Sequence, residues 1–193
     1  MKLSRLLLTL TLSTALIGVP AFASNAQSNI QKTSPVLVTS PAAQATDVQS
    51  LDGIVAALYD VISGGIGQPR NWNRMRSLFI PEARIMAIVP KRDSSDLALR
   101  IMSVSDYIAN SGPVLIETGF REKEITRKTE HWGELAQVFT TYETIMDKDG
   151  IVRRGINSIQ LMNDGTRWWI VSLLFEAERD QLRLPEAYLA PAK

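Results

Sequence analysis

The chain has 193 residues with 21 basic and 20 acidic side chains, so it lacks the charge excess typical of nucleic-acid-binding proteins. It contains no cysteine, which excludes disulfides, thiol catalysis and cysteine-based metal sites. A single histidine excludes a multi-histidine metal site, and no G-x-S-x-G segment supports a serine triad. We therefore expect a protein without a metal, a cofactor or a nucleic-acid partner.

The N-terminus has the pattern of a secretory signal peptide. Lys2 and Arg5 form a short positive region, an apolar run follows over 6–19, and the segment A-F-A at 21–23 is a cleavage site. The alternative is a membrane anchor, but a hydrocarbon core needs about 20 apolar residues and this run is short. We expect cleavage of residues 1–23, export to a periplasm or the medium, and no membrane span in the mature protein.

Residues 24–45 are rich in Ser, Ala, Gln, Thr and Pro, which is typical of a flexible linker. We expect one folded domain over 46–178 and a C-terminal tail over 179–193. Apolar periodicity predicts a first helix that begins at Thr46, with Gln49 completing a capping box, and ends at Gly64-Gly65. The apolar face of this helix would carry Val48, Leu51, Val55, Leu58 and Ile62.

A second helix and two short strands come next. The helix is expected to begin near Asn71 and to end at Pro81, which cannot continue it. Apolar segments over 84–89 and 97–102 predict the two strands. The core side of this helix would carry Trp72, Met75 and Phe79.

A third helix precedes a series of longer strands. Ser103 and Asp106 predict its start, and Gly112-Pro113 its end. Two turns end in Asp-Gly, a pair that is typical of β-hairpins, so the strands that they join are expected to form an antiparallel meander. Helices followed by a meander indicate an α+β fold with helices on one face of a sheet. The predicted strands cover 120–130, 133–146, 151–162 and 167–176, with turns at 147–150 and 163–165.

Three stretches carry a family resemblance. The helical start, LFIPEAR at 78–84, and the end, GINSIQL at 155–161 with DGTRWWIV at 164–171, resemble the NTF2-like superfamily, in particular its SnoaL-like and DUF4440-like bacterial proteins. The resemblance covers residues 47–178. It implies a cone with N-terminal helices on a strongly curved antiparallel sheet, a pocket inside, and frequent dimerisation. The superfamily includes ketosteroid isomerases, dehydratases, polyketide cyclases and binding subunits, so the function stays open.

The hairpins give a crude register, which predicts a pocket face. With a four-residue turn at 147–150 and a two-residue turn at 164–165, we expect Thr141, Asn157 and Ser172 to lie side by side. A small polar centre within an apolar wall is typical of a small-molecule pocket. The wall would consist of Phe139, Ile159, Leu161, Trp168, Ile170 and Leu174.

Three polar residues have both a catalytic and a structural interpretation. Glu143 is a candidate general base, and the alternative is an ion pair with Arg153 or Arg154. Tyr59 is a candidate acid, with core packing as its alternative. Asn157 would orient a ligand carbonyl or hydrogen-bond within the sheet.

Further ligand-binding candidates come from outside this polar centre. Arg84 would hold an anionic ligand at the mouth of the cone, unless it pairs with a carboxylate such as that of Glu82. Trp72 and Trp168 are candidate ligand walls, and their alternative is packing in the core.

The opposite face of the sheet is also expected to be apolar. Such a face must be covered, either by the tail over Leu182–Leu189 or by a second subunit, and we expect a homodimer through this face. The residues concerned are Val138, Tyr142, Ile156, Trp169, Val171, Leu173 and Phe175.

Three functions are compatible with these patterns. The first is an exported protein that binds a small, mostly apolar molecule in the cone. The second is a lyase or isomerase that uses acid/base chemistry, with Glu143 as base and Tyr59 or Asn157 stabilising an oxyanion. The third is a non-catalytic protein-interaction module. A cavity without titratable groups would favour binding, and the absence of a cavity would favour the third.

Overall fold

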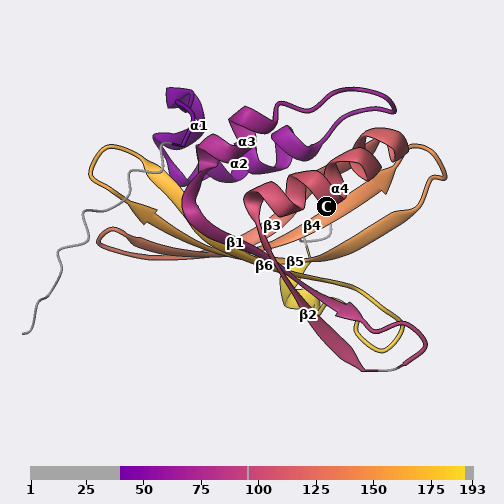
Figure 1. The fold of residues 1–193 in the computed structure, drawn as a ribbon. Coiled ribbons are helices and arrows are strands. Elements are labelled where there is room, and N and C mark those ends of the chain that lie inside the picture. Colours follow the sequence, from indigo (N-terminus) through magenta and orange to yellow (C-terminus); the bar gives the residue numbers. More distant parts are fainter. Residues whose placement is uncertain (1–39, 95, 190–193) are drawn as a thin grey trace, which may run out of the picture. The chain divides into compact units, whose positions relative to one another are not determined.

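The computed structural model describes residues 40–94 and 96–189, in which helices pack on one face of a six-stranded sheet (Figure 1). The predictions for the signal peptide and most of the linker lie outside the described residues. Within the described ranges, no helix is long and apolar enough to cross a membrane.

The first helical segment is divided where a single helix was expected. α1 (Ala45–Val48) and α2 (Leu51–Ile62) are separate helices. The predicted capping box at Thr46 is wrong, because Ser50 caps α2: its hydroxyl accepts a 2.9 Å hydrogen bond from the Gly53 N–H. The apolar periodicity still identifies the core side, and the buried face of α2 includes Ile54, Val55, Leu58 and Ile62.

The second helix begins as predicted and is shorter than predicted. α3 (Trp72–Leu78) is capped by the side chain of Asn71. Phe79 was expected in the helix and instead opens β1 (Phe79–Pro90), so Pro81 lies within a strand. Pairing is irregular at this point, as expected where proline offers no N–H to a neighbouring strand.

The third helix, α4 (Val104–Thr118), begins as the sequence predicts and ends later. Its capping box forms, with the Ser103 hydroxyl accepting a 3.1 Å hydrogen bond from the Asp106 N–H. The end predicted at Gly112-Pro113 is wrong. The helix runs on to Thr118 and ends at Gly119, whose φ of 66° is in the left-handed region that favours glycine.

A packing contact explains the internal glycine of α4. A Cβ at Gly112 would lie 3.0 Å from the ring of Trp72, so the glycine lets α3 approach α4 closely. Pro113 is exposed, so the turn that lacks its N–H faces water. The Gly-Pro pair therefore serves packing at this position and does not end the helix.

The sheet is mixed. Its strand order is β2-β1-β6-β5-β4-β3, and all neighbours are antiparallel except β1 and β6, which are parallel. The α+β fold and the final meander are confirmed, and the expectation of a wholly antiparallel sheet is wrong. The parallel pair arises because β6, whose direction is set by β5, lies beside β1. The remaining strands are β2 (Leu97–Ser103), β3 (Phe120–Trp132), β4 (Leu135–Met146), β5 (Val152–Asn163) and β6 (Trp168–Ala177).

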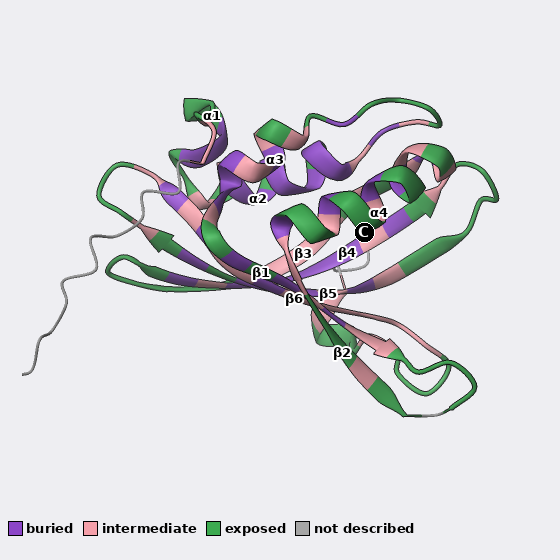
Figure 2. Ribbon diagram, viewed as in Figure 1, coloured by how far each residue is buried: buried purple, intermediate pink, exposed green. Residues whose placement is uncertain are grey.

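The core lies between the helices and the sheet face that they cover, which we call the inner face (Figure 2). Burial is concentrated there, because α2 and the central strands bring their apolar sides together. Fully buried side chains of this core include Ile54, Met75, Leu78, Val138, Ile159 and Ile170.

A buried arginine joins the ends of three elements beside this core. The Arg70 guanidinium donates hydrogen bonds to the carbonyls of Ile62 at 3.0 Å, Gly64 at 2.7 Å, Leu115 at 3.2 Å and Phe120 at 3.3 Å. These carbonyls belong to the end of α2, the loop after it, the last turn of α4 and the start of β3. One side chain therefore holds together one end of the inner face.

The opposite, outer face of the sheet is partly covered by the C-terminal tail. The ring of Tyr188, in η1 (Glu186–Tyr188), packs edge-on against Phe139 with 5.3 Å between centroids. The Thr141 hydroxyl donates a 2.7 Å hydrogen bond to the Tyr188 carbonyl. Beyond the tail, Leu97, Leu99 and Ile101 of β2 are 44, 54 and 61% exposed. The tail is therefore one cover of the outer face, and it leaves the β2 edge open.

Candidate functional site

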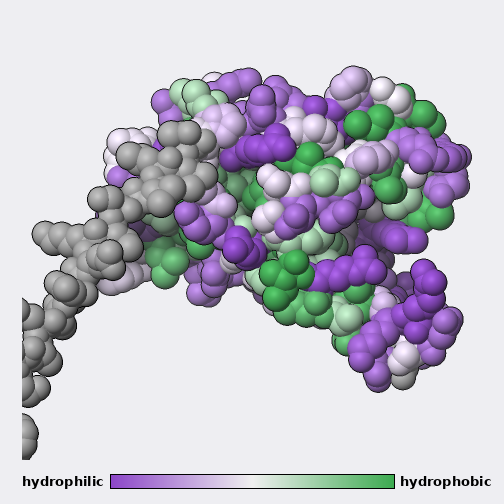
Figure 3. Space-filling view, viewed as in Figure 1, coloured by the Kyte–Doolittle hydropathy of each residue, from purple (hydrophilic) through white to green (hydrophobic). Residues whose placement is uncertain are grey.

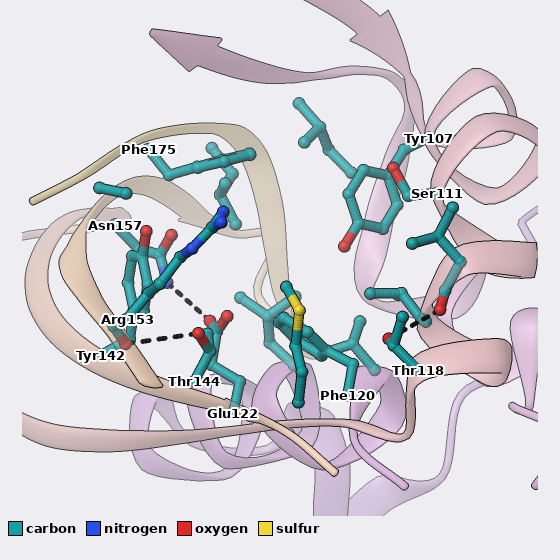
Figure 4. A pocket seen from close by; sticks show the side chains of 18 of the residues that line it. Tyr107, Ser111, Thr118, Phe120, Glu122, Tyr142, Thr144, Arg153, Asn157 and Phe175 are labelled. Carbon is teal, nitrogen blue, oxygen red and sulfur yellow. Dashed lines mark hydrogen bonds between the residues drawn. The ribbon is translucent and has the colours of Figure 1, made fainter. Parts of the chain in front are cut away.

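An open cavity of about 340 Å³ lies between α4 and the inner face of the sheet (Figure 4). Its wall is mostly apolar, and a few polar groups converge within it, which is the composition of small-molecule sites. The apolar side chains include Leu58, Ile62, Leu115, Phe120, Leu173 and Phe175.

The carboxylate in this cavity is Glu122, on the inner face of β3. The left-handed Gly119 lets the chain turn from α4 directly into the strand. The Glu122 N–H then donates a 2.8 Å hydrogen bond to the Ser63 hydroxyl, which ties β3 to the end of α2. Because side chains alternate along a strand, Glu122 shares its face with Phe120, and both line the cavity.

Glu122 has no cationic partner among the residues described. Its Oε1 accepts a 3.3 Å hydrogen bond from the Asn157 amide, and no ion pair forms. Burial raises the pKa of Glu122 to about 7, although the Asn157 hydrogen bond acts in the opposite direction. The carboxyl group therefore changes its charge near neutral pH, as a general base or acid requires.

A series of hydrogen bonds through Tyr59 of α2 and Thr140 of β4 holds Asn157 in place. Its amide also donates to the Tyr59 hydroxyl at 3.1 Å, and Tyr59 lies 3.1 Å from the Thr140 hydroxyl. Thr140 donates to Glu124 at 2.7 Å, so Tyr59 is the donor to Thr140. Tyr59, Thr140 and Asn157 are all buried. These hydrogen bonds thus direct the two amide hydrogens of Asn157 toward Tyr59 and Glu122.

Two tyrosines line the cavity from opposite sides. Tyr107 comes from α4, and its hydroxyl points into the cavity, whereas Tyr142 comes from β4 (Figure 4). Gly155 makes room for Tyr142, since an added Cβ would lie 2.4 Å from its hydroxyl. Burial raises the pKa of both phenols, so they stay protonated and can donate hydrogen bonds. Neither hydroxyl has a hydrogen-bond partner within 40–94 and 96–189.

Of the three residues predicted to form the polar centre, only Asn157 lines the cavity. The turn at 147–150 is as predicted, but counting from it pairs Asn157 with Thr140, so the adjacency to Thr141 is wrong. Thr141 faces outward to the tail. Ser172 is also on the outer face, opposite Gln160, to which it donates a 3.0 Å hydrogen bond.

The register error at Ser172 has two causes. The turn before β6 is longer than the predicted two residues, because the Asp164 carboxylate accepts hydrogen bonds from the N–H groups of Thr166 and Arg167. The pairing of β5 with β6 then shifts once more between Gln160 and Leu161. A slip of one residue moves a side chain to the other face, so the predicted faces are mixed. Four residues expected opposite Asn157 instead share its inner face: Val138, Tyr142, Leu173 and Phe175.

The two predicted catalytic residues lie outside the cavity lining. Glu143 forms a 2.9 Å ion pair with Lys123 on β3, and neither expected partner holds it, since Arg154 pairs with Glu178. Tyr59 lies beneath Asn157 and uses its hydroxyl in the hydrogen bonds described above. In this structure the carboxylate that faces the cavity is that of Glu122 and not that of Glu143.

The remaining predicted ligand contacts are also away from the cavity. Arg84 donates hydrogen bonds to the carbonyls of Glu82 and Ala83. Trp72 packs against Gly112 of α4. Trp168 is buried at the far end of the inner face, with its ring 5.4 Å from that of His131.

The sequence interpretation missed most of the polar groups in the cavity. Glu122, Tyr142 and Arg153 were not assigned to it, and Tyr107 was assigned to no site. One local signal was present: Glu122 follows apolar Phe120 by two residues directly after a Gly that ends a helix. The same face of a strand then carries an apolar side chain and a carboxylate, which is unusual for a solvated edge.

No group of three or more His, Asp or Glu side chains in the described part of the chain could hold a metal ion. Comparison with protein-family models gives no match, and comparison with curated proteins gives none.

Solved structures share the fold. LinA is 8% identical, with 75% of this chain and 93% of LinA covered and a TM-score of 0.52. A protein of unknown function with a cystatin-like fold from Nostoc punctiforme is 8% identical, with 68% and 91% covered and a TM-score of 0.50. An NTF2-like protein of unknown function from Silicibacter pomeroyi is 15% identical, with 67% and 94% covered and a TM-score of 0.44. The α+β fold is as predicted, and the chain shares it with LinA and the Nostoc punctiforme protein.

Proposed function

We propose that the chain binds a small, mostly apolar molecule in the inner cavity. The observation that carries this proposal is the cavity itself: about 340 Å³ of open space with an apolar wall and a few convergent polar groups. Because one of these groups, Glu122, is titratable, the same cavity also favours acid/base chemistry. A protein-interaction module that fills its cone with its own side chains would not keep this space, because voids cost packing energy. Glu122, Asn157 and the two tyrosine hydroxyls would orient the polar part of the ligand.

A cavity-filling variant tests this proposal. Ser111 lines the cavity from α4, so Ser111→Phe should occupy part of the space and weaken binding of the neutral fluorescent probe phenyl-naphthylamine by at least about tenfold, or 1.4 kcal/mol. Ser105→Phe makes the same change at an exposed position of the same helix and should leave binding unchanged. Equal binding by both variants and the wild type would place the probe outside the inner cavity and contradict the proposal.

The open β2 edge supports a second proposal, that two copies associate through the outer face. Leu97, Leu99 and Ile101 form an exposed apolar row beside the tail, and Figure 3 shows hydrophobic surface over this part of the sheet. Such a row is unfavourable in water and typical of an interface. The occupant is a second copy of this chain, because the superfamily that the sequence resembles frequently dimerises across its sheet.

One native mass spectrum of the protein purified from its host addresses ligand, dimer and export together. A retained small mass that is lost on unfolding would support the binding proposal. A dimer would support association, and a monomer at micromolar concentration would contradict it. A subunit mass equal to residues 24–193 would support cleavage and export, whereas the mass of the full chain would contradict both.

A second candidate function is acid/base chemistry on the bound molecule, and Glu122 specifically favours it. A half-buried carboxyl group with no cationic partner in the described ranges, and with a pKa raised to about 7, is suited to accept a proton from carbon. An enolate oxygen formed in this way could receive hydrogen bonds from Tyr107 or Tyr142. This is the isomerase or lyase alternative, with Glu122 in the role that the sequence interpretation gave to Glu143.

Deuterium exchange separates the two functions without a known substrate. If Glu122 is a base, the protein should accelerate exchange of the α-protons of an apolar ketone such as tetralone in D2O, and Glu122→Gln should abolish the acceleration. Glu143→Gln is the matched control and should retain it. Exchange at the uncatalysed rate with a ketone that binds would leave binding as the function.

A further inference from the structure

Resting on the proposed binding function, we propose that the ligand is an amphipathic monoanion whose anionic group is held by Arg153 at the mouth of the inner cavity. The ligand class is an aromatic or alicyclic body that carries one carboxylate or sulfonate. This assigns a specific polar requirement to a cavity whose wall is otherwise apolar.

The position of Arg153 is set by β5. Arg153 pairs with Thr144 and precedes Asn157 by four residues, so all three side chains lie on the inner face. Arg153 lines the cavity and is exposed, which places it at the opening, together with Asn110 and Val114 of α4. Figure 4 shows its side chain extending along the cavity side of the sheet from the strand that also carries Asn157.

The charge of Arg153 has no counterpart among the described residues, and this distinguishes it from the cations around it. Lys123 pairs with Glu143 at 2.9 Å, and Arg154 pairs with Glu178 at 3.0 Å. Glu143 and Glu178, which line a surface hollow together with Arg153, are therefore already engaged by other cations. An unpaired arginine on the surface is common, but this one borders an apolar cavity of ligand size.

The other charge of the cavity does not neutralise Arg153. Glu122 and Arg153 line the same space, yet they form no ion pair, and Glu122 instead accepts from Asn157. The positive charge of Arg153 is felt inside the cavity, where it partly offsets the effect by which burial raises the pKa of Tyr142. An anionic group near the opening would meet this field, while the apolar body would extend inward past Phe175.

The arginine side chain favours a planar or tetrahedral oxyanion. Its guanidinium presents parallel N–H donors that match two oxygens of a carboxylate or sulfonate. A lysine at the same position would keep the charge and lose this geometry. The proposal therefore predicts that affinity for an anionic ligand falls partly in Arg153→Lys and further in Arg153→Gln. An arginine that only contacts solvent would give no such series.

The test compares two probes that share one apolar body. Anilinonaphthalene sulfonate is anionic, and phenyl-naphthylamine is the neutral counterpart without the sulfonate. The wild type should bind the anionic probe more tightly, and Arg153→Gln should weaken its binding about tenfold while the neutral probe is unchanged. Arg153→Lys should lie between, and the effect should diminish at high salt.

Two controls identify the site and the charge effect. Ser111→Phe should weaken both probes if they occupy the inner cavity. Arg100→Gln removes an exposed arginine from β2 and should change neither. Equal affinity for the two probes, or an equal loss in Arg100→Gln, would overturn the assignment to Arg153 while binding stands. Failure of either probe to respond to Ser111→Phe would show that the proposed function itself is wrong.

Discussion

Glu122 and Glu143 lie on neighbouring strands of one sheet, and their surroundings are opposite. Glu143 forms a 2.9 Å ion pair with Lys123, as surface carboxylates commonly do. Glu122 faces the apolar cavity, has only the Asn157 amide as a partner among the described side chains, and has its pKa raised to about 7. Of these two carboxylates, the one on the outer face is therefore paired with a cation, and the one on the inner face is not.

This difference shows where the structure contains a group that lowers the stability of the folded protein. An unpaired carboxyl group in an apolar wall destabilises the folded protein when it is ionised, and pairing would remove that cost. Such departures are expected at functional sites. The inner cavity is therefore the better candidate for function, although both faces of the sheet contain carboxylates and apolar side chains.

The largest effect on stability is expected from removing the Arg70 guanidinium, which joins three elements at one end of the inner face. Arg70→Leu would leave the carbonyls of three elements without the guanidinium that binds them. We expect a loss of about 3–5 kcal/mol in the free energy of unfolding, measured by urea denaturation. Arg121→Leu breaks an exposed ion pair with Asp147 and should cost much less. Similar losses in the two variants would contradict the structural role of Arg70.

A smaller effect, with a distinctive pH dependence, is expected from Glu122 itself. Because its pKa is higher in the folded state, the folded protein binds a proton more tightly than the unfolded chain does. Stability should therefore fall as pH rises from the ordinary carboxylate range through about 7. Glu122→Gln should remove this slope and raise the free energy of unfolding above pH 7 by about 2 kcal/mol.

The matched variant on the other face is Glu143→Gln. It breaks the ion pair with Lys123, so it should lower stability by less than about 1 kcal/mol at neutral pH. Thermal unfolding of both variants between pH 4 and 8, values chosen to bracket the titration of Glu122, would measure the contrast. Parallel curves for the two variants would mean that the faces do not differ as described.

Among the changes made at the inner face, the smallest effect should come from the hydrogen bonds that hold Asn157. Tyr59→Phe removes the hydroxyl between Asn157 and Thr140 and leaves buried polar groups without it, at a cost of about 1–2 kcal/mol. Tyr188→Phe keeps the ring that packs on Phe139 and should be close to neutral. If Tyr59→Phe is equally neutral in denaturant unfolding, these hydrogen bonds do not hold Asn157.

Local chemistry made several elements predictable from the sequence. The start of α4 followed from Ser103 and Asp106, because a capping box needs only residues three apart. The turn at 147–150 followed from its Asp-Gly ending. The end of α4 could not be predicted in this way. Gly112 makes room for the ring of Trp72, which is distant in the sequence, and does not end the helix.

The candidate site was less predictable, because it depends on register between strands. Most of β3 is polar, so no apolar alternation marks which side of Glu122 is buried, and its pairing with β4 shifts between Glu124 and Thr126. The register shift in the pairing of β5 with β6 similarly places Ser172 on the face opposite to Asn157. A bulge of this kind has no reliable local signature, yet it decides which face each side chain occupies.

The unpaired state of Glu122 can be measured directly by carbon NMR. In protein labelled at the glutamate carboxyl carbons, one resonance should titrate near pH 7 and be absent from the spectrum of Glu122→Gln. Such a result would support an unpaired carboxyl group in the apolar cavity. If the resonance assigned to Glu122 titrates in the ordinary carboxylate range, Glu122 is solvated or paired, and the central difference between the two faces is wrong.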